Sequence, residues 1–485
     1  MIIAIHRVLP LGLCIAGAAR GCGDARPAPA PCPANAITLQ PGSNVEKTVR
    51  SAPAGASFCV APGVYRRTSI IPRNGQKFFG EGQATLNGAR AITQFTRDGA
   101  LWVASRQTQQ GYRHGKENCL PSRPRCGDPE AFYINDKPLL AVNKKSLVTT
   151  GTFYFDYPND RIYFADDPNG KTVEASVAPY AFLGGAGGVV IDGLIVEKYS
   201  SPIQFAAISY NMPTPNWTLS NNEVRLNYGL GVSVGTNGQI LNNKIHDNGE
   251  MGIGCNGDDI LIEGNEIYGN GFFAGLDPAW EGGGGKCVLT NRLVFRSNYS
   301  HDNNSYGFWT DIDNINTLYE KNRIEDNANG GISHEISYAA TIRNNTFEGN
   351  GWAFNVWLWG SAILVQNSRD VDVHDNHVVI TAAGNGISLI QQNRGSGKFG
   401  SHATDNNFIH DNTIISRHPD AGAWGAIADY DLASMEAANN RFQNNTYEVT
   451  SGADDHWAWV DRFYNWKAYR KKSGQDSTST LIVSP

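Results

Sequence analysis

The sequence has little charge of either sign and no excess of basic residues. Asp, Glu, Lys and Arg make up 18% of its 485 residues, and the formal net charge is −6. A chain without an excess of positive charge is a poor partner for nucleic acid, so no nucleic-acid binding is expected. The sequence also lacks paired Cys-x-x-Cys spacings, which argues against a structural zinc site.

No apolar run after the first twenty residues is suited to spanning a bilayer, and no transmembrane segment is expected. Residues 8–19 are apolar, follow His6 and Arg7, and end in small residues, so residues 1–21 are interpreted as a signal peptide of an exported protein, periplasmic or extracellular. Lipoprotein anchoring at Cys22 is the less favoured alternative, because Arg20 stands where a small or branched residue is needed. Residues 22–36 are rich in Pro and Ala and are predicted to be a linker.

Six cysteines follow Cys22, and export would allow them to form disulfides. Cys119 and Cys126 enclose a short loop and are the best candidates for a disulfide. Cys255 and Cys287 lie in neighbouring repeats, where the alternative is a pair of stacked core thiols, because free cysteine packs as a small hydrophobe.

What the chain does have is a regular series of asparagines. A β-branched or aromatic residue stands two places after each of them except at Ser300, and the tightest spacings are 21, 22, 24 and 23 residues. These spacings are too short for a βαβ unit and fit one coil of a solenoid, so we predict an all-β fold, a right-handed parallel β-helix. The asparagines should stack at one bend and bond to one another, while the apolar residues point inward. The members of this series are Asn222, Asn243, Asn265, Asn298, Asn322, Asn345, Asn376, Asn412 and Asn445.

The remaining segments are assigned by their local patterns. Residues 37–99 are predicted to form an N-terminal cap, with an amphipathic helix at 45–51, and the first coils. Alternating strands joined by Pro-Asn-Asp and Asp-Pro-Asn-Gly turns predict an inserted antiparallel β subdomain at 100–178. Coils are predicted over 179–450, and residues 451–485 should cap the last coil with Trp457, Trp459 and Trp466.

The repeats also set a register for side chains. The ninth residue after the ladder asparagine is glycine in three coils, at Gly252, Gly307 and Gly331. Strand alternation from there sends His334 inward, as a hydrogen-bonded core histidine, and sends Asp311 and Glu335 outward. These two carboxylates are 24 residues apart in a 24-residue coil and should therefore lie on adjacent strands, about 4.8 Å apart.

Two carboxylates this close cannot both ionise without cost. Either one has a raised pKa, or a cation such as Ca²⁺ lies between them, with Asp313 as a third ligand. Asp313 is alternatively a turn residue that serves only the backbone.

A 33-residue coil inserts extra residues before Lys286, and such insertions mark one face of a solenoid. Lys286 should face outward beside Trp309, with Trp280 and Glu281 as a wall. Later long coils should bring three further substrate-binding residues toward this groove, although Trp357, like Trp280, alternatively covers apolar core. These three are Trp357, Trp359 and Gln391.

The repeats over roughly residues 37–447 resemble the pectate-lyase-like superfamily of right-handed parallel β-helix proteins, and EGGGGKCVLTNRLVFRSN, GFWTDIDN and GGISHEISY resemble strings of exported bacterial β-helix proteins. The resemblance implies a secreted enzyme acting on a polysaccharide or oligosaccharide, as a lyase, hydrolase or epimerase. The chain has Trp309-Thr310-Asp311 where alginate and chondroitin lyases carry arginine–histidine–glycine. It also lacks the paired-aspartate and Gly-His-Gly strings of polygalacturonases and the Asp-Pro-His-Asp string of alginate epimerases.

Three functions follow from these residues. The leading expectation is a polysaccharide lyase in which Lys286 takes the C5 proton of a uronate while Ca²⁺, held by Asp311, Asp313 and Glu335, neutralises the uronate carboxylate. The alternative is a retaining glycoside hydrolase that uses Asp311 and Glu335 as nucleophile and acid. A non-catalytic glycan-binding protein is the third, because a fold does not imply a function.

Overall fold

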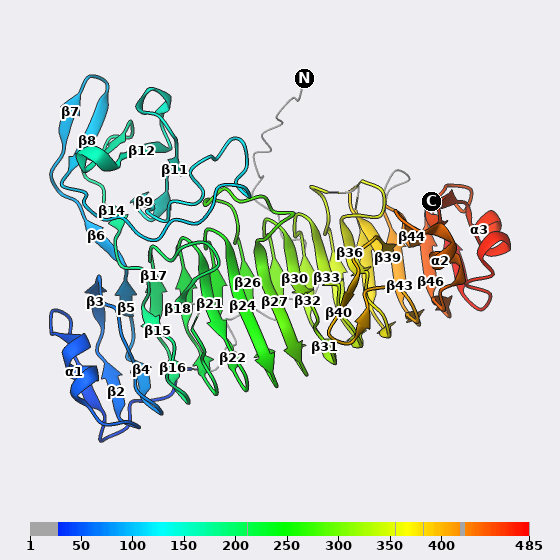
Figure 1. The fold of residues 1–485 in the computed structure, drawn as a ribbon, viewed down its shortest axis with the longest axis horizontal. Coiled ribbons are helices and arrows are strands. Elements are labelled where there is room, and N and C mark those ends of the chain that lie inside the picture. Colours follow the sequence, from blue (N-terminus) through cyan, green and yellow to red (C-terminus); the bar gives the residue numbers. More distant parts are fainter. Residues whose placement is uncertain (1–27, 211, 355, 382, 418–421, 485) are drawn as a thin grey trace, which may run out of the picture.

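The computed structural model describes residues 28–210, 212–354, 356–381, 383–417 and 422–484. The predicted signal peptide, Cys22 and the first part of the predicted linker lie outside these residues. The chain winds into a long parallel β-helix with a smaller β subdomain above its N-terminal coils (Figure 1). Among the described residues, no helix combines the length and apolar character needed to cross a bilayer.

Three long sheets form the walls of the β-helix, and consecutive coils contribute consecutive strands to each. The first sheet contains β1 (Ile37–Leu39), β2 (Ser57–Val60), β4 (Lys77–Gly80), β16 (Val190–Asp192), β19 (Thr218–Ser220), β22 (Gln239–Leu241), β25 (Leu261–Glu263), β28 (Val294–Arg296), β31 (Thr317–Glu320), β34 (Ala340–Arg343), β37 (Val371–His374), β42 (Phe408–His410) and β45 (Arg441–Gln443). The second contains β3 (Gly63–Arg66), β5 (Ala84–Asn87), β17 (Ile195–Glu197), β20 (Glu223–Arg225), β23 (Lys244–His246), β26 (Glu266–Tyr268), β29 (Tyr299–His301), β32 (Arg323–Glu325), β35 (Thr346–Glu348), β38 (His377–Ile380), β43 (Thr413–Ser416), β46 (Thr446–Val449) and β49 (Thr480–Val483).

The third sheet has the longest strands and carries the candidate site. Its members are β15 (Phe182–Leu183), β18 (Ala206–Ser209), β21 (Leu230–Val234), β24 (Met251–Asp258), β27 (Gly283–Asn291), β30 (Tyr306–Asp311), β33 (Gly330–Glu335), β36 (Ser361–Gln366), β39 (Asn385–Gln391), β44 (Trp424–Ala428), β47 (Trp457–Val460) and β48 (Arg462–Tyr464). All neighbours are parallel except β47 and β48.

The predicted asparagine ladder is confirmed as a continuous chain of hydrogen bonds. Each member donates its backbone N–H and its side-chain amide to the Oδ1 of the next, for example Asn222 to Asn243 at 2.9 and 3.0 Å. The residue before each ladder asparagine has a positive φ, such as 55° at Asn221 and 56° at Asn242. Asparagine tolerates this left-handed conformation, which explains why the asparagines are often doubled.

A second ladder runs parallel to the first, five residues later in each coil, and the sequence analysis did not identify it. Asn227 donates to Asn248, and the series continues through Asn270, Asn303, Asn327 and Asn350. Between the two ladders the predicted apolar positions are fully buried, from Val224 to Tyr447. Each bend therefore satisfies its own backbone groups while its apolar residue fills the core.

Both ends of the β-helix are covered. Helix α1 (Val45–Ser51) has the predicted bounds and buries Val45 and Val49 against the first coil. At the other end, α2 (Leu432–Ala437) and α3 (Trp466–Ser473) lie over the last coils, where Trp457 is fully buried in the core. These caps keep the apolar core and the open strand edges from water.

The subdomain consists of two small, mostly antiparallel sheets between residues 89 and 176, so its strands begin before residue 100, the predicted start of the insert. One contains β6 (Ala89–Ala91), β9 (Phe132–Ile134), β10 (Lys137–Pro138) and β14 (Val173–Ser176); the other contains β7 (Thr96–Asp98), β8 (Leu101–Ser105), β11 (Leu140–Ala141), β12 (Thr152–Asp156) and β13 (Arg161–Phe164). Two 3₁₀ turns, η1 (Lys145–Leu147) and η2 (Tyr157–Asn159), join these strands. A separate hairpin, β40 (Ser396–Gly397) and β41 (Gly400–Ser401), belongs to a later coil.

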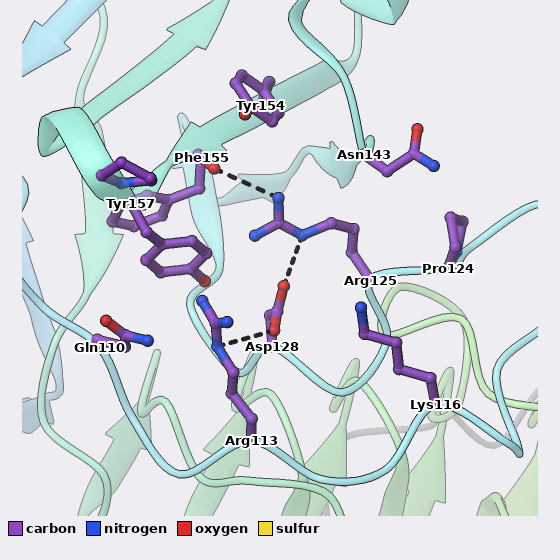
Figure 2. A pocket seen from close by; sticks show the side chains of 11 residues that line it. Gln110, Arg113, Lys116, Pro124, Arg125, Asp128, Asn143, Tyr154, Phe155 and Tyr157 are labelled. Atoms are coloured by element: carbon purple, nitrogen blue, oxygen red, sulfur yellow. Dashed lines mark hydrogen bonds and ion pairs between the residues drawn. The ribbon is translucent and has the colours of Figure 1, made fainter.

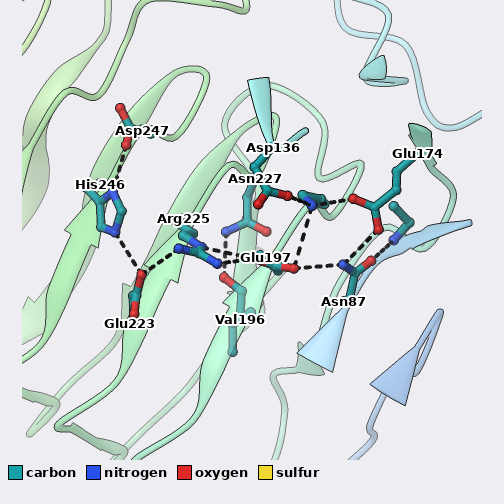
Figure 3. A network of polar contacts seen from close by, with 12 residues as sticks. Asn87, Asp136, Glu174, Val196, Glu197, Glu223, Arg225, Asn227, His246 and Asp247 are labelled. Carbon is teal, nitrogen blue, oxygen red and sulfur yellow. Dashed lines mark hydrogen bonds and ion pairs between the residues drawn. The ribbon is translucent and has the colours of Figure 1, made fainter. Parts of the chain in front are cut away.

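A buried ionic network fastens the subdomain to the β-helix (Figure 3). Lys198, whose side chain is 2% exposed, contacts both Asp136 and Glu174 of the subdomain. Glu197 of β17 accepts from Asn87 at 2.8 Å and pairs with the guanidinium of Arg225 at 2.9 Å. Because each buried charge has an opposite partner, the network holds the two parts in one orientation.

Three disulfides are present in the described residues. Cys119–Cys126 confirms the predicted pair, and Cys32–Cys59 ties the first coil to the segment before it. Cys255 and Cys287 are bonded to each other, so the alternative of stacked free thiols is wrong for this pair. Their inward positions on paired strands bring the two sulfurs together.

Candidate functional site

The floor of the candidate site is the outer face of three neighbouring strands, β27, β30 and β33. Lys286 pairs with Trp309, and Asp311 pairs with Glu335, as the register predicted. The alternate positions point into the core: His334 is fully buried and bonds to Thr310 Oγ1 at 2.7 Å and to the carbonyl of Tyr338 at 2.8 Å. Burial lowers the pKa of His334 to about 4, so it is a neutral core residue, as expected.

The inserted segment of the 33-residue coil, residues 271–282, forms one wall of a groove of about 630 Å³ above this floor. Six predicted residues line the groove together: Trp280, Glu281, Lys286, Trp309, Asp311 and Glu335. The glycine run before Lys286 lets the coils approach closely, because a Cβ on Gly284 would lie 2.2 Å from the carbonyl oxygen of Gly307. The run therefore has a packing role beneath the groove.

Lys286 and Asp311 form an ion pair at the centre of the floor. The Lys286 Nζ lies 3.0 Å from Asp311 Oδ2 and 4.1 Å from the centre of the Trp309 ring, and it donates to the carbonyl of Trp280 at 3.3 Å. A carboxylate, an aromatic face and a carbonyl therefore surround the Lys286 Nζ. The other oxygen of Asp311 is buried and bonds to no group of the described residues.

Glu335 has a different environment. Its Oε2 accepts from the indole N–H of Trp309 at 3.0 Å, and its Oε1 accepts from Arg394 at 2.5 Å. Burial and then the neighbouring Asp311 raise the pKa of Glu335, although Arg394 and Lys286 oppose the shift. The two facing carboxyl groups are therefore chemically distinct, since one lies against a lysine and the other tends to hold its proton.

A second acidic pair lies at the N-terminal side of the groove. Gln204 donates its backbone N–H to Glu250 at 2.8 Å and its side-chain amide to Glu281 at 2.8 Å. Glu250 is fully buried, one of its oxygens has no partner among the described residues, and burial raises its pKa strongly. Gln204 thus holds Glu281 in the wall.

The sequence analysis did not single out Arg394, Gln204 or Glu250. Arg394 lies shortly after the predicted Gln391 in the sequence, and only its contact with Glu335 identifies it. No sequence signal indicated Gln204 or Glu250.

Four predicted residues do not line the groove. Asp313 accepts from His402 at 3.0 Å and from the backbone of Lys398 at 3.1 Å, so it orders the loop of the β40–β41 hairpin. Gln391 accepts from the backbone of Thr404 at 2.6 Å. Trp357 and Trp359 pack farther along the same sheet against an apolar cluster that contains Leu358 and Ile390, as the alternative interpretation of Trp357 expected.

The predicted calcium ligands do not fit a metal site in this arrangement. Asp311 and Glu335 already have cationic partners, and Asp313 is turned toward His402. Among the described residues, the only three-residue group with ligand atoms close enough for one ion is Cys32, Cys59 and Glu81, and its cysteines are bonded to each other. The site is therefore described through its own acids and bases.

Comparison with known proteins agrees with this fold. A sequence model described as a right-handed β-helix region matches residues 207–378, and no curated protein sequence matches the chain. The structure described as XylC in complex with xylose superposes with a TM-score of 0.65 at 16% identity, over 90% of this chain and 82% of that one. The A-module of the mannuronan C-5 epimerase AlgE6 of Azotobacter vinelandii superposes with a TM-score of 0.51 at 13% identity, over 91% and 93%. The predicted right-handed parallel β-helix is confirmed.

Proposed function

We propose that this protein is an exported glycoside hydrolase of the retaining type, with Asp311 as nucleophile and Glu335 as general acid and base. The observation that carries the proposal is the in-register pairing of these two residues on adjacent parallel strands at the floor of one groove. Adjacent strands are about 4.8 Å apart, and retaining enzymes hold their two carboxyl groups about 5–5.5 Å apart.

The surroundings of the two carboxyl groups assign the roles of acid and nucleophile. Glu335, whose pKa is raised by burial and by Asp311, supplies the proton that the leaving oxygen needs. Asp311 lines the groove beside Lys286 and faces Glu335, so its carboxyl group is assigned the attack on the anomeric carbon. In the first step the Asp311–carbon bond forms, the glycosidic bond breaks and Glu335 protonates the leaving oxygen. In the second, water attacks the same carbon, Glu335 takes the proton back and Asp311 leaves.

β-Elimination is the second candidate. Lys286 and Arg394 both lie in the groove, and cations are suited to a uronate carboxylate. The weakness lies in the base, because the Nζ of Lys286 is already held against Asp311 and the Trp309 ring rather than free to approach C5 of a uronate. We therefore place this mechanism after hydrolysis.

Three observations support a saccharide substrate and export of the protein. The groove is lined by Trp280 and Trp309, and aromatic side chains are suited to stacking on sugar rings. The two structural neighbours named above carry xylose or mannuronan in their descriptions. The three disulfides fit an oxidising compartment.

The test is turnover of a panel of aryl glycosides and polysaccharides by residues 23–485, with reducing ends and absorbance at 235 nm measured together. Hydrolysis predicts reducing ends without a rise at 235 nm, unchanged by EDTA, and abolished in Asp311→Asn but not in the exposed-turn control Asp302→Asn. A rise in absorbance at 235 nm that is lost in Lys286→Ala would show elimination instead of hydrolysis. If EDTA also abolished that rise, the reaction would depend on calcium. Binding without any product, retained in Asp311→Asn, would indicate a glycan-binding protein.

A further inference from the structure

A second hollow lies on the subdomain, outside the groove (Figure 2). It has a volume of about 600 Å³ and lies between the loop of residues 110–128 and the end of strand β12. The loop contributes Arg113, Lys116, Arg125 and Asp128, and the strand end contributes aromatic rings. Neither the sequence motifs nor the proposed hydrolytic step uses these residues.

The hollow has an excess of positive charge. Asp128 lies between the two guanidinium groups, 3.2 Å from Arg113 and 2.5 Å from Arg125 (Figure 2). Lys116 points into the same space and forms no ion pair with any described residue (Figure 2). Three cations therefore share one carboxylate, and the lining has an unbalanced charge of two units that an anionic ligand would neutralise.

The two guanidinium groups are held in place before any ligand binds. The guanidinium of Arg125 donates to the carbonyl of Phe155 at 3.3 Å, and that of Arg113 stacks over the Tyr157 ring at 4.3 Å. Tyr157 in turn stacks on Phe155 at 4.1 Å and donates its hydroxyl to the buried Glu130 at 2.5 Å. The half-buried Tyr154 ring lies beside this arrangement, where a sugar face can stack.

The same loop also builds the wall of the groove. Its residues Asn118 and Leu120 form backbone hydrogen bonds of 3.0 Å with Asp277 and Gly275 of the inserted segment. The His114 ring packs against Trp280, with 5.8 Å between ring centres. One face of the loop therefore supports the groove while the other lines the hollow, and the Cys119–Cys126 disulfide fixes its shape.

We propose that this hollow is an accessory subsite for an acidic sugar, whose carboxylate binds Arg113, Lys116 and Arg125 while its ring stacks on Tyr154. The inference deepens the proposed function, on which it rests: the substrate is then a glycan that carries uronic acid units apart from the bond that is cleaved. Paired guanidinium groups bind carboxylates through parallel N–H donors, which gives specificity beyond charge alone.

The experiment measures binding in affinity gels that contain polygalacturonate, its methyl ester or dextran sulfate, with Asp311→Asn as the parent so that no cleavage occurs. Polygalacturonate should retard the parent, and its methyl ester, which keeps the ring without the charge, should not. Adding Arg113→Gln and Lys116→Gln together should weaken binding about tenfold, equivalent to about 1.4 kcal/mol. The matched pair Arg161→Gln and Lys171→Gln removes two exposed cations from the same subdomain and should leave binding unchanged.

Arg113 and Lys116 are both exposed, so these substitutions should not unfold the loop, and Lys116→Glu alone is a milder variant that should also weaken binding. Unchanged binding by the Gln pair and by Lys116→Glu would overturn the subsite. Equal retardation by the methyl ester, equal retardation by dextran sulfate, or equal loss in the matched pair would also overturn it, because binding would then not depend on a carboxylate at this hollow.

The result of the binding experiment does not depend on whether the protein is a hydrolase. Uncharged aryl glycosides carry no carboxylate for the hollow to bind, so the Arg113→Gln, Lys116→Gln pair in an otherwise unaltered chain should cleave them at the normal rate. If no aryl glycoside is cleaved but polygalacturonate still binds, the proposed hydrolase is rejected and the subsite is retained. If aryl glycosides are cleaved normally but polygalacturonate does not bind, the subsite is rejected and the hydrolase is retained.

Discussion

Replacing Arg394 by Gln should move the alkaline limb of the pH–activity profile to higher pH. The general acid must be protonated to act, so activity falls as pH rises through the pKa of Glu335. Arg394 donates to Glu335 at 2.5 Å and lowers that pKa against the larger effects of burial and Asp311. Its removal leaves only Lys286 to oppose the upward shifts of the Glu335 pKa, and the limb must therefore move upward.

The size of the shift follows from the contact. An opposite charge within about 4–6 Å changes the pKa of a carboxyl group by about 1–3 units. Arg394 is about one-third exposed, and solvent screens part of its effect, so the upward shift should be smaller than that from a fully buried pair. The acidic limb should move much less, because Arg394 forms its ion pair with Glu335.

The assay is the pH dependence of kcat/KM on an aryl glycoside with a poor leaving group, from about pH 4 to 9. Arg369→Gln is the matched control, because Arg369 pairs with Asp370 outside the groove. Glu335→Gln should remove the limb and lower the rate about 10²–10⁴-fold. Two results together would refute Glu335 as the general acid. The alkaline limb would stay in place or move to lower pH in Arg394→Gln, and Glu335→Gln would still show that limb.

Three further predictions concern stability, each measured by urea unfolding. Lys198→Met should lower the free energy of unfolding by about 1.5–3 kcal/mol, because the buried Glu174 loses its ammonium partner and keeps only Arg66 as a cationic partner; an unchanged midpoint would contradict the network. Replacing Cys255 and Cys287 together by Ser should cost about 2–5 kcal/mol under oxidising conditions, and the difference from the parent should shrink in reductant. Asn298→Ala removes hydrogen bonds to both neighbouring coils and should cost at least about 1–3 kcal/mol, whereas a neutral result would mean that water replaces the ladder.

Much of the β-helix could be predicted from the chain because its determinants are local and repeated. A doubled asparagine specifies both the left-handed bend, as at Asn221, and the ladder contact, as at Asn222. Repetition at about 23 residues then fixes which strands become neighbours. The pairing of Asp311 with Glu335 followed from the same count. The second ladder, from Asn227 onward, shows the same periodicity and was available to the same reasoning.

Residues in long coils could not be placed in this way. Trp357 and Trp359 lie among the extra residues before strand β36, and Gln391 ends strand β39, directly before the loop that holds the β40–β41 hairpin. Periodicity says nothing about the path of such segments. The tryptophans instead cover an apolar cluster on the outer face of the sheet, and Gln391 bonds to a neighbouring backbone group. For Asp313 the sequence left open a calcium ligand or a turn residue, and the structure shows its carboxylate bonded to His402.

The sequence by itself determined the solenoid, its caps and the outward row that contains Lys286, Asp311 and Glu335, because strand alternation and a constant coil length act at every turn. Only the tertiary structure decided how these charges are shared. Arg394 is 59 residues from Glu335, and the loop of residues 110–128 comes from another part of the chain. Contacts between such distant segments depend on how loops and an inserted subdomain pack over the coils, and no local period encodes that packing.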